Sequence, residues 1–124
     1  MLTFTPRFDI MIVSIRKGNK EMLKDLFKSR VVYALINEDK KVVYVGQTER
    51  DALTRIGEHI STYSTVRKYI EKHKDTPLEM RILFEYKRNH KDIKQKLENK
   101  ETYFIKHFVK LGYTLINQKK IKNI

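Results

Sequence analysis

The sequence predicts an α/β (α+β) domain with a small, mainly antiparallel sheet of about three core strands flanked by helices, plus an extra strand and helix at the N-terminus. Short runs rich in Val, Tyr and Ile alternate with segments in which apolar residues recur every three or four positions, patterns typical of strands and amphipathic helices. A polar four-residue segment joins two of the strand-like runs, which favours an antiparallel hairpin. The 124 residues suffice for one hydrophobic core, so we expect a single folded domain.

The first 30 residues are predicted to add a strand from Phe8 to Ile15 and a helix from Lys20 to Ser29. The strand is too hydrophobic to remain exposed, so it is buried in its own sheet or against a second copy of the chain in a homodimer. We favour its own sheet, because sequential elements tend to pack together. The helix would then add phosphate contacts through its outer lysines, Lys20, Lys24 and Lys28.

The hairpin is predicted from the runs Val31–Ile36 and Val42–Val45, which flank the turn Asn37–Lys40. Gly46 and Gln47 are expected to end the second strand.

A helix is expected after this strand, with Thr48 as its N-cap and Asp51 in a capping-box arrangement. Arg55 and His59 are four residues apart and therefore share one face of this helix. That face is offset from the apolar stripe of Leu53, Ile56 and Ile60, so both polar side chains can point at a ligand.

The remaining elements follow the same logic. A second helix contains Val66 and Tyr69, and it stops before Pro77 because proline cannot continue a helix. A half-buried strand follows at Leu78 to Tyr86. A long helix is then expected, capped by Asn89 and ended by Gly112, before a short closing strand at residues 113–117.

The charge of the chain predicts a polyanionic partner. Lys and Arg number 27 against 15 Asp and Glu, a net charge of +12, and nucleic acid is the partner we expect. A basic protein without such a partner is the alternative that charge alone leaves open. The absence of cysteine excludes disulfides and thiolate zinc sites, and it fits a reducing cytoplasm. We expect neither a membrane span nor a signal peptide.

The hairpin and first helix carry a family resemblance. Val-Val-Tyr ending at Tyr33, Tyr-Val-Gly from Tyr44 to Gly46, and then Arg55 and His59 resemble the ordered motifs of the GIY-YIG nuclease family. Tyr33 takes the place of the tyrosine in GIY, and Tyr44 that of the tyrosine in YIG. Val-Val replaces Gly-Ile in the first triplet, which leaves less room for a close backbone approach. Val also replaces Ile in the second triplet.

The family pattern continues with a glutamate on a later helix and an asparagine near the end. Glu101 and Asn117 stand in those places, with Asn117 and Gly46 expected to support the site rather than react. The resemblance covers residues 31–118. It leaves residues 1–30 as an extension packed on the core and 119–124 as a basic tail.

The resemblance implies an endonuclease that hydrolyses DNA phosphodiester bonds with one Mg²⁺ or Mn²⁺ ion, without a small-molecule cofactor, leaving 5′-phosphate and 3′-hydroxyl ends. In this assignment Glu101 binds the metal, and Arg55 stabilises charge on the transition state. Tyr33 deprotonates the attacking water if its pKa is lowered, and Tyr44 orients water or substrate. His59 donates to the phosphate or relays a proton.

Each of these residues also has a purely structural interpretation. Glu101 falls on the apolar stripe of its helix and could be buried in an ion pair with Arg55 or a lysine. Either tyrosine could be strand packing, and Arg55 or His59 could be an ordinary helix residue. Three other histidines match no motif position and are expected to be structural or exposed: His73, His90 and His107.

DNA contacts are expected from basic residues on the hairpin turn and the second helix, namely Lys41, Arg67, Lys68 and Lys72. Two other functions stay open: a catalytically inactive nucleic-acid-binding module, and a ribonuclease, although no RNA-recognition signature is present. The bias toward Lys, Ile and Asn suggests a phage or mobile element, acting in a bacterial or phage-infected host cell.

Overall fold

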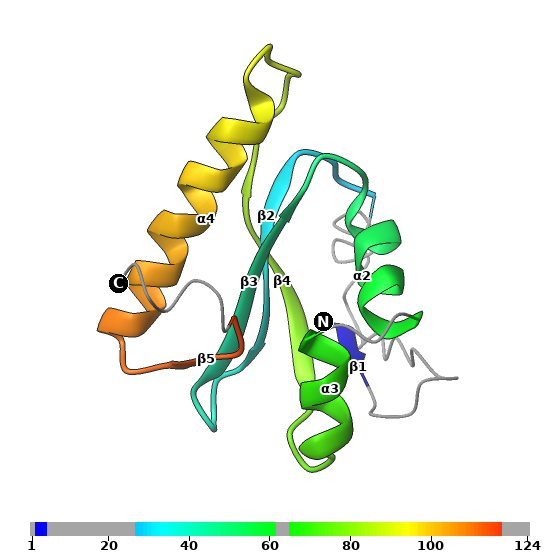
Figure 1. Ribbon diagram of the computed structural model, residues 1–124, viewed down its shortest axis with the longest axis vertical. Helices are drawn as coiled ribbons and strands as arrows, with labels where there is room; N and C mark the ends of the chain where they lie inside the picture. Colours follow the sequence, from blue (N-terminus) through cyan, green and yellow to red (C-terminus); the bar gives the residue numbers. More distant parts are fainter. Residues whose placement is uncertain (1, 5–26, 62–64, 118–124) are drawn as a thin grey trace.

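A five-stranded sheet runs through the protein and carries helices on both faces (Figure 1). The structure, a computed structural model, describes residues 2–4, 27–61 and 65–117. The elements in chain order are β1 (Leu2–Phe4), β2 (Val31–Asn37), β3 (Val42–Thr48), α2 (Ala52–Ser61), α3 (Thr65–Lys72), β4 (Leu78–Glu85), α4 (Ile93–Lys110) and β5 (Thr114–Leu115).

The strand order is β1-β4-β2-β3-β5, and every pair is antiparallel except β3 with β5. The three long strands β2, β3 and β4 form the centre, so the predicted fold class is confirmed. The hairpin register aligns Val31 with Thr48 and Asn37 with Val42. Lys41 closes the turn with a φ of 53°, and its backbone N–H donates to Glu38 O at 3.3 Å.

The central strand β2 is buried on both faces, which explains its continuous apolar sequence. Val31, Tyr33 and Leu35 face one core cluster with residues of α2 and α3. Val32 and Ile36 face a second cluster with α4 on the other side. The protein therefore has three layers, with α2 and α3 on one side of the sheet and α4 on the other (Figure 1). Burial of each large side chain contributes roughly 1.5–3 kcal/mol.

The start of α2 differs from the sequence prediction. β3 runs through Gly46 and Gln47 to Thr48, because pairing with β2 continues to the end of the hairpin. Thr48 is consequently a strand residue, and its Oγ1 accepts the N–H of Arg50 at 3.1 Å. Asp51 caps the helix instead, since its Oδ1 accepts the N–H of Thr54 at 2.8 Å.

The start of α4 also differs from the prediction. Asn89 Oδ1 accepts the N–H of His90 at 3.0 Å rather than capping the helix, and α4 begins four residues after Asn89, at Ile93. Asp92 occupies the N-cap position without a side-chain cap hydrogen bond. The predicted end is confirmed, because Gly112 adopts a φ of 86° directly after Leu111, the C-cap.

The N-terminal prediction falls largely outside the described residues. The strand from Phe8 to Ile15 lies there, and so does the helix from Lys20, except for residues 27–29, which are not helical. β1 pairs in the same sheet, with Leu2 opposite Met80. The domain boundaries stay a prediction. In the described part of the chain, no helix has the length and apolar character needed to cross a bilayer.

Candidate active site

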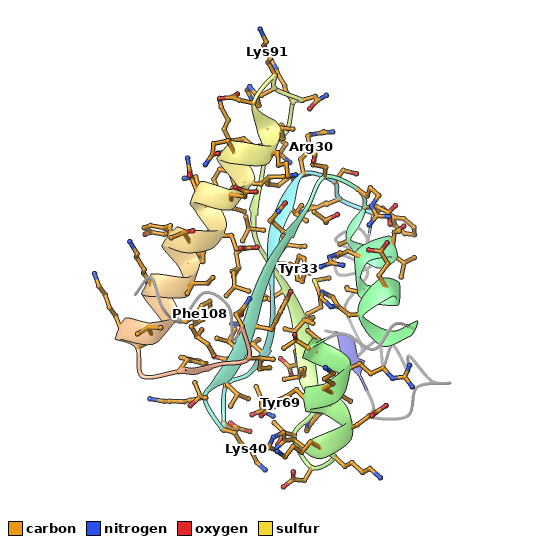
Figure 2. The ribbon with its side chains drawn as sticks, viewed as in Figure 1. Arg30, Tyr33, Lys40, Tyr69, Lys91 and Phe108 are labelled. Atoms are coloured by element: carbon orange, nitrogen blue, oxygen red, sulfur yellow. The ribbon has the colours of Figure 1, made fainter. Side chains whose placement is uncertain are left out.

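Four polar side chains from the hairpin and α2 meet on one face of the sheet. Tyr33 lies on β2 and Tyr44 on β3, and their ring centroids are 6.4 Å apart. His59 approaches both rings edge-on, at 6.0 Å from Tyr33 and 5.0 Å from Tyr44. Figure 2 shows Tyr33 between the sheet and α2. The fourth side chain, Arg55, comes from the same helix as His59, as the four-residue spacing predicted.

A buried hydrogen bond joins the hairpin to α2 at this point. Tyr33 Oη and His59 Nε2 are 2.6 Å apart. Burial raises the pKa of Tyr33 well above its ordinary value, with Tyr44 adding to the shift and Arg55 opposing it. Burial also lowers the pKa of His59 to about 4, and the charge of Arg55 acts in the same direction. At neutral pH the phenol is therefore protonated and the imidazole neutral, and the tautomer of His59 sets which of the two donates in this hydrogen bond.

Gly46 is required by this arrangement. It lies opposite Tyr33 in the hairpin, on the face that carries both tyrosines. A Cβ at position 46 would lie 2.5 Å from Tyr33 Oη and 2.9 Å from the Tyr44 ring. An alanine there would push the phenol away from His59, so the glycine supplies the space that its hydroxyl occupies.

Arg55 is partly exposed and carries its charge next to both tyrosines. The side chain is 34% exposed, and its Nη1 lies 3.3 Å from Glu58 Oε1. Burial raises the pKa of Tyr44, as it does that of Tyr33, and Arg55 lowers both through its charge and hydrogen bonding. Arg50 also binds Glu58, with both carboxylate oxygens within 2.7 Å of its Nη2. This Arg50–Glu58–Arg55 cluster was not predicted from the sequence, although the three-residue spacing of Glu58 from Arg55 indicates part of it.

Glu101 lies in the opposite layer, on the buried stripe of α4. It is 5% exposed, and its neighbours one turn away, Leu97 and Ile105, pack with Val45 in the second core cluster. The prediction that its carboxylate faces the interior agrees with the structure. Tyr33 and α2 belong to the first core cluster, so Glu101 comes from the layer on the other side of the sheet.

Asn117 holds the backbone of β3 through two hydrogen bonds to Val45. Its Oδ1 accepts the N–H of Val45 at 2.9 Å, and its Nδ2 donates to the carbonyl of Val45 at 2.7 Å. Val45 lies between Tyr44 and Gly46, so the amide holds the strand that carries both residues. This geometry agrees with a supporting role for Asn117.

The sequence of this domain matches a known family. The family model for the GIY-YIG catalytic domain matches residues 29–114. The chain belongs to the GIY-YIG family. No curated protein and no solved structure matches it. GIY-YIG catalytic domains are nuclease domains, so the family assignment makes nucleic acid the substrate class of this chain. Asn117 lies three residues beyond the matched segment.

The metal expected in a GIY-YIG domain has one candidate ligand among the predicted residues. Glu101 offers a carboxylate, a hard oxygen donor that suits Mg²⁺ or Mn²⁺. Its burial fits this role, because a buried carboxylate is stabilised by a cation. Within residues 2–4, 27–61 and 65–117, no three His, Cys, Asp or Glu residues gather into a cage. A single carboxylate, completed by waters and phosphate oxygens, stays the expectation for this metal.

The predicted DNA-contacting residues occupy different places. Lys41, Lys68 and Lys72 are exposed, whereas Arg67 is partly buried and bonds Glu71 at 2.9 Å. Lys28 is partly buried. Lys20 and Lys24 lie outside the described residues. The three histidines without a motif position are surface or packing residues: His107 is exposed, and His73 and His90 contact Tyr69 and Tyr86.

Proposed function

We propose that this GIY-YIG domain is a metal-dependent endonuclease that hydrolyses DNA phosphodiester bonds. The observation that carries the proposal is the buried hydrogen bond between Tyr33 and His59, beside the partly exposed Arg55. It combines a proton donor, a proton acceptor and a fixed positive charge at one place. A bound Mg²⁺ or Mn²⁺ would supply stabilisation of the leaving oxygen. We assign this ion to Glu101, whose carboxylate would have to reach it past the edge of β3, since α4 packs on the other face of the sheet.

The Tyr33–His59 pair provides a route for the proton of the attacking water. The water gives a proton to Tyr33 Oη while Tyr33 passes its own proton to His59 Nε2. The phenol never needs to ionise beforehand, which its raised pKa would make costly. The hydroxide oxygen bonds to phosphorus as the bond between phosphorus and the 3′-oxygen breaks, and the leaving 3′-oxygen takes a proton from solvent. His59 returns its proton to solvent, and the products are a 5′-phosphate and a 3′-hydroxyl.

Tyr44 and Arg55 position the water and the phosphate in this reaction. Tyr33 is fully buried, whereas Tyr44 is partly exposed and can move to admit the water. Its hydroxyl then orients water or substrate. Arg55 presents a planar guanidinium that binds two phosphate oxygens and stabilises the negative charge that develops there.

Incubation with a supercoiled plasmid tests the proposal. The purified chain is expected to convert the plasmid to nicked or linear DNA with Mg²⁺, and to leave it intact with excess EDTA. A second reaction contains equal amounts of labelled plasmid and labelled structured RNA, so that the cleavage rates of the two substrates can be compared directly. Binding of the plasmid without cleavage under any divalent cation would favour an inactive module, and preferential RNA cleavage would favour a ribonuclease.

The lowered pKa of His59 predicts how stability depends on pH. The pKa falls from 6.5 in the unfolded chain to about 4 in the folded one, so the unfolded state binds more protons between these values. The stabilising effect of neutral His59 is therefore fully present above pH 6.5 and is lost as the pH falls toward 4. Between pH 7 and 5.5, this group should lower the free energy of unfolding by about 1 kcal/mol.

Urea unfolding of the wild type and of His59→Gln at both pH values measures this contribution. The wild type is expected to lose about 1 kcal/mol more than the variant. Equal losses in the two proteins would mean that the pKa of His59 is not lowered in the folded chain, and would contradict the buried environment assigned to the Tyr33–His59 pair.

A further inference from the structure

A cleft beside α3 is not used by the proposed chemistry. It has a volume of about 600 Å³. This volume lies within the range of pockets that hold small organic molecules. Its lining comes from α3, the residue that follows it and the segment around β5: Thr65, Lys68, Tyr69, Glu71, Lys72, His73, Leu115 and Ile116.

The lining combines positive charge with a flat aromatic surface. Lys68 and Lys72 are exposed and stand one helical turn apart. The rings of Tyr69 and His73 are stacked, with centroids 4.2 Å apart and an interplanar angle of 26°. Figure 2 shows Tyr69 on α3. The acidic residue of the lining, Glu71, is bonded by Arg67 at 2.9 Å, so the positive charge of the lysines dominates the cleft.

The cleft lies beside α3, which packs on the sheet face that carries the candidate active site. Ile116, on its wall, belongs to the same core cluster as Tyr33, and its N–H donates to Val43 O at 2.8 Å. Val43 precedes Tyr44 in β3. At about 3.3 Å per strand residue, this wall lies within roughly 10 Å of Tyr44. A polynucleotide strand bound at Tyr44 therefore reaches the cleft within a few nucleotides.

We propose that this cleft binds an unpaired nucleotide of the DNA strand that is cut, with the base on the Tyr69–His73 stack and the phosphate near Lys68 and Lys72. Aromatic side chains bind bases of any sequence through their π faces, and lysines bind the backbone phosphates. Bases of a regular duplex are stacked inside the helix and cannot enter such a cleft. The preferred substrate is therefore DNA with a single-stranded portion next to the scissile bond, such as a flap, gap or branch.

This inference rests on the proposed function for its substrate, but its test needs no cleavage. Fluorescence anisotropy in EDTA measures the Kd of a 12-nucleotide thymidine strand and of a 12-unit abasic strand with the same phosphates. Wild-type protein is expected to bind the thymidine strand about tenfold more tightly, as one stacked base would provide. Tyr69→Leu keeps the apolar contact with the core and should bring this ratio close to one.

Tyr103→Leu is the matched control, because Tyr103 is an exposed tyrosine on α4, across the sheet from the cleft. It should leave the ratio unchanged. If Tyr69→Leu does not fold, His73→Gln takes its place, since His73 is the other half of the stack. A ratio near one in the wild type, or a ratio unaffected by both cleft variants, would overturn the cleft assignment. A protein that fails to cut plasmid but shows the expected ratios would overturn the nuclease proposal alone.

Discussion

Glu101→Gln is expected to abolish Mg²⁺-dependent cleavage while leaving the fold intact. The amide keeps the shape of the side chain but removes the negative charge that would hold the cation. Metal ions contribute several kcal/mol of transition-state stabilisation, so the single-turnover rate should fall by at least about 10²-fold. DNA binding in EDTA and the melting temperature should change little, because glutamine keeps the volume of the side chain and an oxygen that can accept a hydrogen bond.

Glu98→Gln is the control for this variant, three residues earlier on the same helix and partly exposed. It removes the same charge from α4 without touching the buried stripe, and it should cleave at the wild-type rate. Wild-type cleavage by Glu101→Gln would exclude Glu101 as the metal ligand and would leave it as a structural carboxylate.

Arg55→Ala is expected to lower the cleavage rate at saturating DNA by at least about 10²-fold, since loss of one preorganised charge at a transition state costs about 2.7 kcal/mol or more. The same change removes the group that lowers the pKa of Tyr33 and Tyr44. The fold should persist, because the side chain is 34% exposed and its bond to Glu58 is a surface ion pair.

Arg50→Ala separates catalysis from this ion pair. Arg50 binds the same Glu58 at 2.6 Å, and its side chain is 58% exposed. Its removal breaks the shared contact without affecting the tyrosines, so the rate should stay within a few-fold of wild type. Equal rate losses in the two variants would assign the effect of Arg55 to the position of Glu58.

The sequence predicted the fold class and the grouping of the hairpin residues well, because both depend on short-range periodicity. Successive side chains of β2 point to opposite faces of the sheet, which places Tyr33 on one of them. The four-residue spacing of Arg55 and His59 places both on one face of α2. The cap of α2 was predicted wrongly. Strand pairing with Val31 holds Thr48 in β3, and such tertiary pairing overrides the local capping preference.

The long-range contacts of the site could not be predicted from periodicity. The 2.6 Å bond between Tyr33 and His59 depends on how closely α2 packs on the sheet, which no local pattern encodes. The contact that restricts position 46 to glycine depends on the same packing. Periodicity likewise placed Glu101 on a buried stripe without indicating which side of the sheet α4 covers.

The composition of the central strand β2 makes the protein sensitive to substitutions that loosen the neighbouring strands. Val31–Ile36 is a six-residue segment without charge, proline or glycine, the composition that forms amyloid-like zippers when exposed. In the fold, β3 and β4 saturate both of its edges, and helices cover both of its faces. A variant that loosens the neighbouring strands would release the segment that carries Tyr33 and promote aggregation. Loss of soluble protein would then accompany loss of cleavage, and activity must be measured per folded molecule.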